Sequence, residues 1–149
     1  MITTEVGRLN KKYSALRLEN QICFPLYAAA KEVVKKYRPL LDALNLTYTQ
    51  YITLLLLWEH EKISSRELGE RLFLDSGTLT PVLKSLERKG YVSRSRSQVD
   101  ERLLDVSLTD AGRALKKSAW TLPYSISGSL NLDDDELSTL YRLLYKILN

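Results

Sequence analysis

The sequence is poor in the residues that build most catalytic and metal centres. It has one cysteine, Cys23, and one histidine, His60, among 149 residues. A single cysteine excludes a disulfide within the chain, and one cysteine with one histidine argues against a zinc site. Glycine-rich phosphate loops and a Ser/His/Asp constellation are also absent. The sequence therefore predicts a protein that is not an enzyme and that carries no metal and no cofactor.

Long apolar runs are missing as well. No unbroken apolar segment approaches the length of about 18 residues that a membrane span needs. The first 20 residues show no apolar core typical of a signal peptide. We therefore expect a soluble, cytoplasmic protein, with one domain over residues 1–149 and a sizeable core.

The charge is mildly basic and unevenly distributed. The formal net charge is +4 and the isoelectric point is about 9.1. Residues 71–102 hold seven basic and four acidic side chains, whereas residues 131–149 hold two basic and four acidic ones. A basic middle and an acidic end indicate that the middle of the chain meets a polyanion.

The segment from Leu72 to Gly90 has the pattern of an amphipathic helix, with Asp75 placed to cap its start and Gly90 to end it. Its opposite face carries small polar and basic groups, which suit a helix lying in the major groove of DNA. An ordinary surface helix has the same period, so the pattern alone leaves both interpretations open. The apolar face comprises Leu79, Val82, Leu83 and Leu86, and the opposite face Gly77, Thr80, Pro81, Lys84 and Arg88.

The neighbours of this helix favour a winged helix-turn-helix. A capping box at Ser64–Glu67 begins a short helix to about Leu72, and a tight link joins it to the helix above. Two alternating segments follow, Tyr91–Arg96 and Leu103–Leu108, with a polar turn between them. A loop that exposes Arg94, Arg96 and Arg102 would suit phosphates or a minor groove.

Helices are predicted on both sides of this unit. A long one spans Asn20–Asn45, and its regular part either begins near Pro25 or kinks there. Pro39 is expected to kink or interrupt its far end. A capping box at Thr47–Gln50 begins a buried helix over Tyr48–His60, with a strand as the alternative. Near the end of the chain, Thr109 caps a helix toward Trp120 and Asp133–Glu136 begins the last helix, whose apolar face is Leu137, Leu140, Leu144 and Ile147.

Four motifs in this order resemble the MarR family of transcription regulators. Asp100, Arg102 and the pair Leu108–Thr109 match the wing signature of that family. Three further segments resemble its organic hydroperoxide resistance regulators, the OhrR branch, in the form with one cysteine. These segments are Asn20–Phe24, Leu46–Tyr51 and Leu72–Pro81, and the likeness covers about Leu18 to the end of the chain.

The resemblance implies a mainly α fold with a small β wing. It implies a homodimer formed through N- and C-terminal helices (18–45 and 109–149) around a winged-helix lobe (46–108). Such a protein represses transcription from a pseudo-palindromic operator in double-stranded DNA. Pro25 departs from the family pattern, which has another residue there.

The resemblance also implies a redox sensor. Cys23 matches the peroxide-sensing cysteine, Tyr37 and Tyr48 match tyrosines that hydrogen-bond its thiol, and Tyr27 matches a pocket residue. This chain lacks the second cysteine of some members. The one-cysteine branch uses a low-molecular-weight thiol to turn the oxidised sulfur into a mixed disulfide.

Helix geometry constrains where that sensor forms. Tyr27 is one turn from Cys23, but Tyr37 is fourteen residues on, about 21 Å along a straight helix. Tyr37 can reach a thiol only if two copies of the helix pack antiparallel, so the site would lie between subunits. A lone cysteine on a helix is more often a small buried hydrophobe, and Tyr37 and Tyr48 could simply pack in an interface.

We predict the DNA-binding residues from the same layout. In the groove we place Ser76, Thr78, Thr80, Pro81 and Lys84, with Lys84 as the base reader, and in the wing Arg94, Arg96, Asp100 and Arg102. Asp100 and Arg102 could instead pair to stiffen the wing. Other interpretations are a regulator of virulence or thiol stress, a repressor released by a phenolic ligand, a thiol peroxidase and a protein-binding winged helix.

Overall fold

The computed structural model describes residues 13–98 and 102–149. Two compact units make up the chain, residues 1–36 and 37–149, and each is considered by itself. The separate assignment of a winged-helix lobe and of dimerisation helices stays a prediction. Two short 3-10 turns, Ser14–Leu16 and Leu18–Asn20, come first. The elements that follow are α2 (Cys23–Asp42), α3 (Tyr48–His60), β1 (Lys62–Ser64), α4 (Ser65–Leu72), α5 (Ser76–Arg88), β2 (Val92–Arg96), β3 (Leu104–Leu108), α6 (Asp110–Ala119), α7 (Leu122–Ser127) and α8 (Asp134–Leu148).

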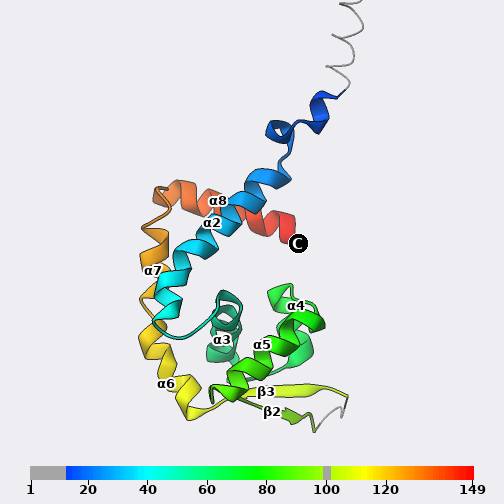
Figure 1. Cartoon of the computed structure of the whole chain (residues 1–149), viewed down its shortest axis with the longest axis vertical. Coiled ribbons are helices and arrows are strands. Elements are labelled where there is room, and N and C mark those ends of the chain that lie inside the picture. The colour runs from blue at the N-terminus through cyan, green and yellow to red at the C-terminus, as the bar shows by residue number, and fades with distance from the viewer. Residues whose placement is uncertain (1–12, 99–101) are drawn as a thin grey trace, which may run out of the picture. The chain divides into compact units, whose positions relative to one another are not determined.

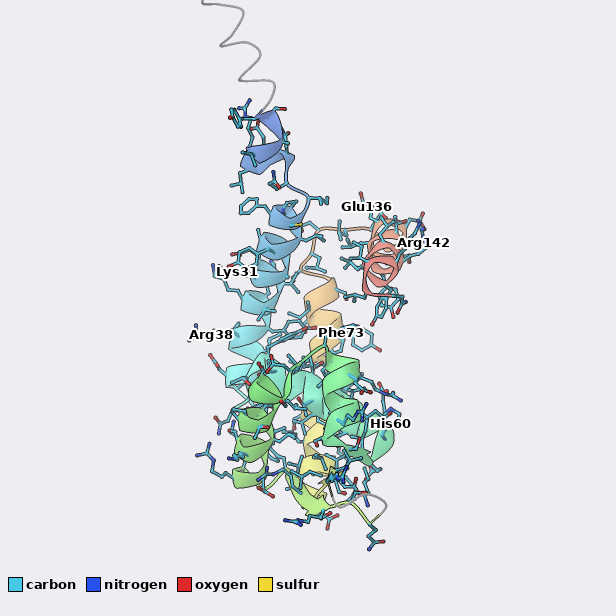
Figure 2. The ribbon with its side chains drawn as sticks, turned by 90° about the vertical axis from the view of Figure 1, so that its right-hand side faces the viewer. Lys31, Arg38, His60, Phe73, Glu136 and Arg142 are labelled. Carbon is cyan, nitrogen blue, oxygen red and sulfur yellow. The ribbon has the colours of Figure 1, made fainter. Side chains whose placement is uncertain are left out.

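Helix α2 begins at Cys23, which agrees with the predicted alternative of a regular helix that begins near Pro25. Asn20 belongs to a 3-10 turn, and Gln21 is extended, so the regular helix starts at Cys23. Pro25 then lies in the first turn, where a backbone N–H has no intrahelical acceptor and its loss costs little. The helix continues through Pro39. In the smaller unit, the exposed side chain of Lys31 projects from α2 (Figure 2).

Helix α3 is the central helix of the larger unit, as predicted. The Thr47–Gln50 capping box is present in both directions. Tyr51, Leu54 and Leu57 are buried, which rules out the alternative strand. Trp58 donates from Nε1 to the carbonyl oxygen of Gly112 at 2.9 Å and so joins α3 to α6.

The predicted helix-turn-helix and wing are confirmed. In Figure 1, α4 and α5 are followed by the β2–β3 hairpin, which lies at the end of α5. The strands pair antiparallel in the order β1-β3-β2, with Val92 opposite Leu108 and Arg96 opposite Leu104. The sequence analysis missed β1, because three residues are too short to show an alternating pattern.

The core of this unit is formed by the apolar sides of its helices and strands. Leu79, Leu83 and Leu86 of α5 are buried, as the periodicity predicted, while Val82 is only partly covered. They pack in one cluster with residues of α3, α4 and the sheet, namely Leu54, Leu57, Leu68, Val92, Val106 and Leu108. Because this cluster fixes one side of α5, the other side is held toward solvent.

Gly112 permits the closest backbone approach in the described part of the chain. A Cβ at this position would lie 2.1 Å from the carbonyl oxygen of Tyr91. We expect Gly112→Ala to lower the free energy of unfolding by about 2–3 kcal/mol, because backbone must move to admit the methyl group. Urea denaturation measures the effect. Gly128→Ala is the matched control, since its Cβ would be 3.5 Å from the nearest atom, and a cost as large as that of Gly112→Ala there would contradict the explanation.

The C-terminal helices begin where their caps predicted. Thr109 accepts a hydrogen bond from the N–H of Gly112, and Asp133 forms a reciprocal capping box with Glu136. Helix α6 ends at Ala119, and the separate α7 (Leu122–Ser127) has Pro123 in its first turn. The apolar face of α8 is largely exposed, with exposures of 40%, 37% and 66% at Leu140, Leu144 and Ile147. None of the helices described is long and apolar enough to cross a membrane.

Candidate functional site

The outward side of α5 presents the polar residues predicted to contact DNA. Asp75 caps the helix, as expected, and Gly90 has a φ of 75° beyond its end. Lys84 lies on the solvent side, opposite the buried leucines. The predicted groove residues of α5 are all exposed: Ser76, Thr78, Thr80, Pro81 and Lys84.

Thr78 differs from the others because its polar groups form the helix cap. Its N–H donates to Asp75 Oδ1 at 2.9 Å, and its hydroxyl donates to Asp75 Oδ2 at 3.0 Å. These two hydrogen bonds hold the pKa of Asp75 below its usual value. The carboxylate therefore stays charged beside the positive end of the helix dipole, and Thr78 positions the start of α5.

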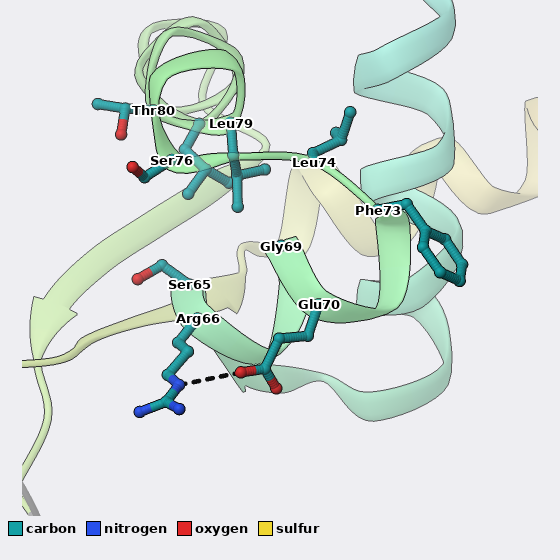
Figure 3. Close-up of a pocket in the computed structure, with 10 residues that line it drawn as sticks. Ser65, Arg66, Gly69, Glu70, Phe73, Leu74, Ser76, Leu79 and Thr80 are labelled. Atoms are coloured by element: carbon teal, nitrogen blue, oxygen red, sulfur yellow. Dashed lines mark hydrogen bonds and ion pairs between the residues drawn. The ribbon is translucent and has the colours of Figure 1, made fainter. Parts of the chain in front are cut away.

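A groove of about 500 Å³ opens between α4 and α5 (Figure 3). Ser65 and Arg66, from the first turn of α4, line it together with Ser76 and Thr80 of α5. Arg66 Nε lies 3.0 Å from Glu70 Oε1 in an exposed ion pair. The sequence analysis missed Ser65 and Arg66, although their place at the start of the first helix of a helix-turn-helix was a usable signal.

The wing arginines occupy different environments. Arg94 lies on β2, within the predicted strand-like segment Tyr91–Arg96. The prediction that the wing exposes Arg94 is wrong, because its side chain is only 20% exposed. Its Nε donates to Glu87 Oε2 of α5 at 3.0 Å, and this hydrogen bond lowers the pKa of Glu87. Arg96 and Arg102 are exposed near the tip. Asp100 lies outside the described residues.

Arg94 also borders a second concave surface of about 550 Å³ on the outer side of α5. Pro81, Lys84 and Arg88 line it with the Glu87–Arg94 pair. Three basic side chains and one acid therefore surround a hollow next to the predicted base-reading residue. The ion pair joins the recognition helix to the wing, so both would meet DNA as one surface.

Cys23 is the first residue of α2, and its side chain is exposed. The smaller unit therefore does not bury the thiol as a core residue. Tyr27, one turn later, is 61% exposed, and the Lys31 ammonium lies 5.1 Å from the centre of its ring. An exposed sulfur in the first turn of a helix is accessible to a solute.

Tyr37 and Tyr48 belong to the larger unit, where the structure brings them together. Their ring centres are 5.1 Å apart, and Tyr51 lies 5.6 Å from Tyr37. Burial, and then the neighbouring Tyr51 and Tyr48, raise the pKa of Tyr37 to about 12. Burial also raises the pKa of Tyr48 and Tyr51. The sequence analysis missed Tyr51, the most buried member of this tyrosine cluster (Tyr37, Tyr48 and Tyr51).

The raised pKa of Tyr37 predicts a late step in an alkaline titration. The folded state favours the neutral phenol, so the stability it contributes is present below pH of about 10 and is lost as the pH rises to about 12. Tyrosinate absorbance should show this late component in wild type. Tyr37→Phe should remove the part of this component near pH 12 and leave the contributions of Tyr48 and Tyr51, and Tyr124→Phe should leave the whole component unchanged. A profile unchanged by Tyr37→Phe would contradict the assignment.

The described residues contain no group of histidine, cysteine and acidic side chains that could hold a metal ion. The functional surfaces that they do form are an exposed polar side of α5, a wing tied to it, an accessible thiol and a tyrosine cluster. Helix α5, with its polar side toward solvent, follows α4 and is followed by the β2–β3 wing. This arrangement defines a winged helix-turn-helix DNA-binding protein.

Comparison with known proteins identifies the family. Residues 31–119 match the family described as "Transcriptional regulator SarA/Rot". The organic hydroperoxide resistance transcriptional regulator of Bacillus subtilis is 48% identical over 94% of this chain and 95% of that protein. The regulator SarZ of Staphylococcus aureus is 45% identical over 83% of each. AbfR of Staphylococcus epidermidis, in its reduced form bound to DNA, is similar with a TM-score of 0.75 and 37% identity, over 93% of this chain and 96% of AbfR.

The chain therefore belongs to the MarR/SarA family of winged-helix transcription regulators. Family membership confirms the fold class and the DNA-binding function that the sequence predicted. It leaves the role of each residue in the site to be tested.

Proposed function

We propose that this protein is a homodimeric, cytoplasmic transcriptional repressor that senses organic hydroperoxides through Cys23. Oxidation of this cysteine releases the protein from an inverted-repeat operator. The observation that carries the proposal is the exposed, single cysteine at the first residue of α2. It lies in a chain that is 48% identical to an organic hydroperoxide resistance regulator.

The chemistry of the sensor needs two outside reactants. The Cys23 thiolate attacks one peroxide oxygen, the O–O bond breaks, and the organic fragment leaves as an alcohol once it is protonated. Sulfur is thereby oxidised to a sulfenic acid and the peroxide is reduced. A low-molecular-weight thiol then attacks the sulfenic sulfur, which forms a mixed disulfide and releases water. No second cysteine of this chain can take that step.

A dimer would bring the tyrosines to the thiol. Along one regular helix Cys23 and Tyr37 are separated by about 21 Å, so Tyr37 would serve the Cys23 of a partner subunit. Neutral tyrosine hydroxyls can donate to a thiolate, and the raised pKa of Tyr37 and Tyr48 keeps them protonated. The exposed apolar face of α8 supports the second subunit, because such a face is normally covered.

On DNA, we place the exposed side of α5 in the major groove, with Lys84 as the base reader and Ser76, Thr80 and Pro81 beside it. Arg96 and Arg102 would contact phosphates or the minor groove. Arg66, at the start of α4, is placed to contact a phosphate next to the groove it shares with α5. Thr78 and Arg94 would hold this surface in shape. Thr78 donates to the cap residue Asp75, and Arg94 donates to Glu87 of α5.

Release requires that oxidation disfavour the spacing of the two recognition helices. A shift from near-full to near-zero occupancy needs about 5 kcal/mol. Each buried polar group that loses its partner contributes about 1–3 kcal/mol. Several broken intersubunit hydrogen bonds, together with the bulk of the adduct, are sufficient.

Fluorescence anisotropy of an inverted-repeat DNA duplex, selected by the reduced protein, tests this function. Cumene hydroperoxide with a low-molecular-weight thiol should release the duplex, whereas salicylate should not. Release by salicylate alone would favour a repressor controlled by phenolic ligands. Continued consumption of many peroxide molecules per protein chain would instead indicate a thiol peroxidase.

The 45% identity to SarZ supports a second candidate within the family. A regulator of thiol stress or virulence would use the same cysteine with a different operator. The sequence of the selected duplex and the genes that carry it separate the two candidates, because the two differ in their operator and not in their cysteine.

A further inference from the structure

Side-chain hydrogen bonds fasten the first turn of α3 to the last turn of α5. Gln50, the third residue of α3, is only 5% exposed. Its Oε1 accepts from Lys89 Nζ at 2.9 Å and from the Thr47 N–H at 3.1 Å. Its Nε2 lies 3.0 Å from Ser85 Oγ. The amide oxygen thus uses both of its acceptor positions, one for the N-cap residue of α3 and one for the C-cap residue of α5.

Lys89 extends this connection to the turn between α2 and α3. Its Nζ also donates to the carbonyl oxygen of Asn45. Asn45 has a φ of 53°, in the left-handed region, and lies between the end of α2 and the cap of α3. Lys89 itself is the C-cap of α5. Burial, and then the nearby Arg88, lower the pKa of Lys89.

The same turn of α3 carries a member of the tyrosine cluster. Tyr48 is the first residue of α3 and contacts Tyr37 of α2, while Gln50 is two residues later. Any displacement of this turn must either break the hydrogen bonds of Gln50 or move the end of α5 with it. Leaving a buried amide without partners is costly, so α5 follows the turn.

We propose that Gln50 is a positioning residue that couples the tyrosine cluster to the recognition helix through Ser85 and Lys89. A change in how Tyr37 and Tyr48 pack moves the first turn of α3, and the Gln50 connection passes this movement to α5. The inference rests on the proposed redox function for the origin of that change. It assigns the path inside one subunit by which the change reaches the DNA-binding surface.

Lys89→Met tests the connection, because it removes both hydrogen bonds that Lys89 donates, to Gln50 and to Asn45, and leaves the Thr47–Gln50 capping box in place. The measured quantity is the ratio of the operator Kd of oxidised protein to that of reduced protein. We expect Lys89→Met to reduce this ratio by about tenfold or more, which is the usual size of a coupling between sites. Arg88→Met is the control, since it removes the same charge one residue away and should weaken both states by the same factor.

Ser85→Ala provides a second variant that breaks only the Gln50 Nε2 contact, and a smaller reduction of the ratio is expected. A wild-type ratio in both Lys89→Met and Ser85→Ala would overturn the coupling while the proposed function stands. Absence of any redox effect in wild type would instead overturn the proposed function.

A double-mutant cycle in the reduced protein tests the coupling without any oxidant. Tyr48→Leu, which removes the ring contact with Tyr37, should change operator affinity less in a Lys89→Met background than in wild type. If the fold-change in Kd of the double variant equals the product of the two single fold-changes, the connection carries no coupling and the inference fails.

Discussion

Cys23→Ser is expected to bind the operator as tightly as wild type and to remain bound in the presence of organic hydroperoxide. Serine keeps the shape and hydrogen-bonding capacity of the side chain, but its oxygen is not oxidised by peroxide. Wild type should lose about 10⁴-fold in affinity after oxidation, which corresponds to the 5 kcal/mol needed for full release. The same duplex and the same anisotropy titration measure both proteins.

Two properties of the structure make this substitution a fair test. Cys23 is exposed at the start of α2, so replacing it leaves no cavity in the core of the described residues. It is also the only cysteine in the sequence, so no other thiol can react in its place. Release of Cys23→Ser by peroxide to the same extent as wild type would exclude Cys23 as the sensor.

Lys84→Ala is expected to give the second large effect. A side chain that reads a base contributes about 1–3 kcal/mol of discrimination, and a dimer on an inverted repeat presents it twice. We therefore expect operator affinity to fall by about 30-fold to 10⁴-fold. Affinity for a duplex with a changed base at the contacted position should fall much less, because the discrimination is already lost.

Lys117→Ala is the matched control for charge. Lys117 is exposed in the last turn of α6, so its loss lowers the net charge equally without touching α5. The salt dependence distinguishes two roles of Lys84, since a phosphate contact lowers the slope by about one and weakens all sequences alike. Equal losses on operator and unrelated DNA would show that Lys84 does not read a base.

Much of the larger unit was predictable because local signals agreed with one another. Asp75, Thr109 and Asp133 each precede an amphipathic period, and each caps a helix in the structure. The burial of Leu79, Leu83 and Leu86 followed from their spacing, and their burial leaves Lys84 exposed.

The errors have a common origin in contacts between distant segments. Arg94 was expected to be exposed in the wing, but its pairing with Glu87 holds its side chain against α5. The three residues of β1 form a strand only because Ile63 lies opposite Val106. The link from Gln50 to Lys89 spans 39 residues, so no local pattern could show it.

The central claim is that the oxidation state of one sulfur controls DNA binding. The most direct test follows operator release by anisotropy and Cys23 modification by intact mass in the same sample, as organic hydroperoxide and a low-molecular-weight thiol are added stepwise. We predict that the released fraction rises in proportion to the fraction of chains with a modified Cys23. Release that is complete while Cys23 is still unmodified, or full modification with the operator still bound, would contradict the account.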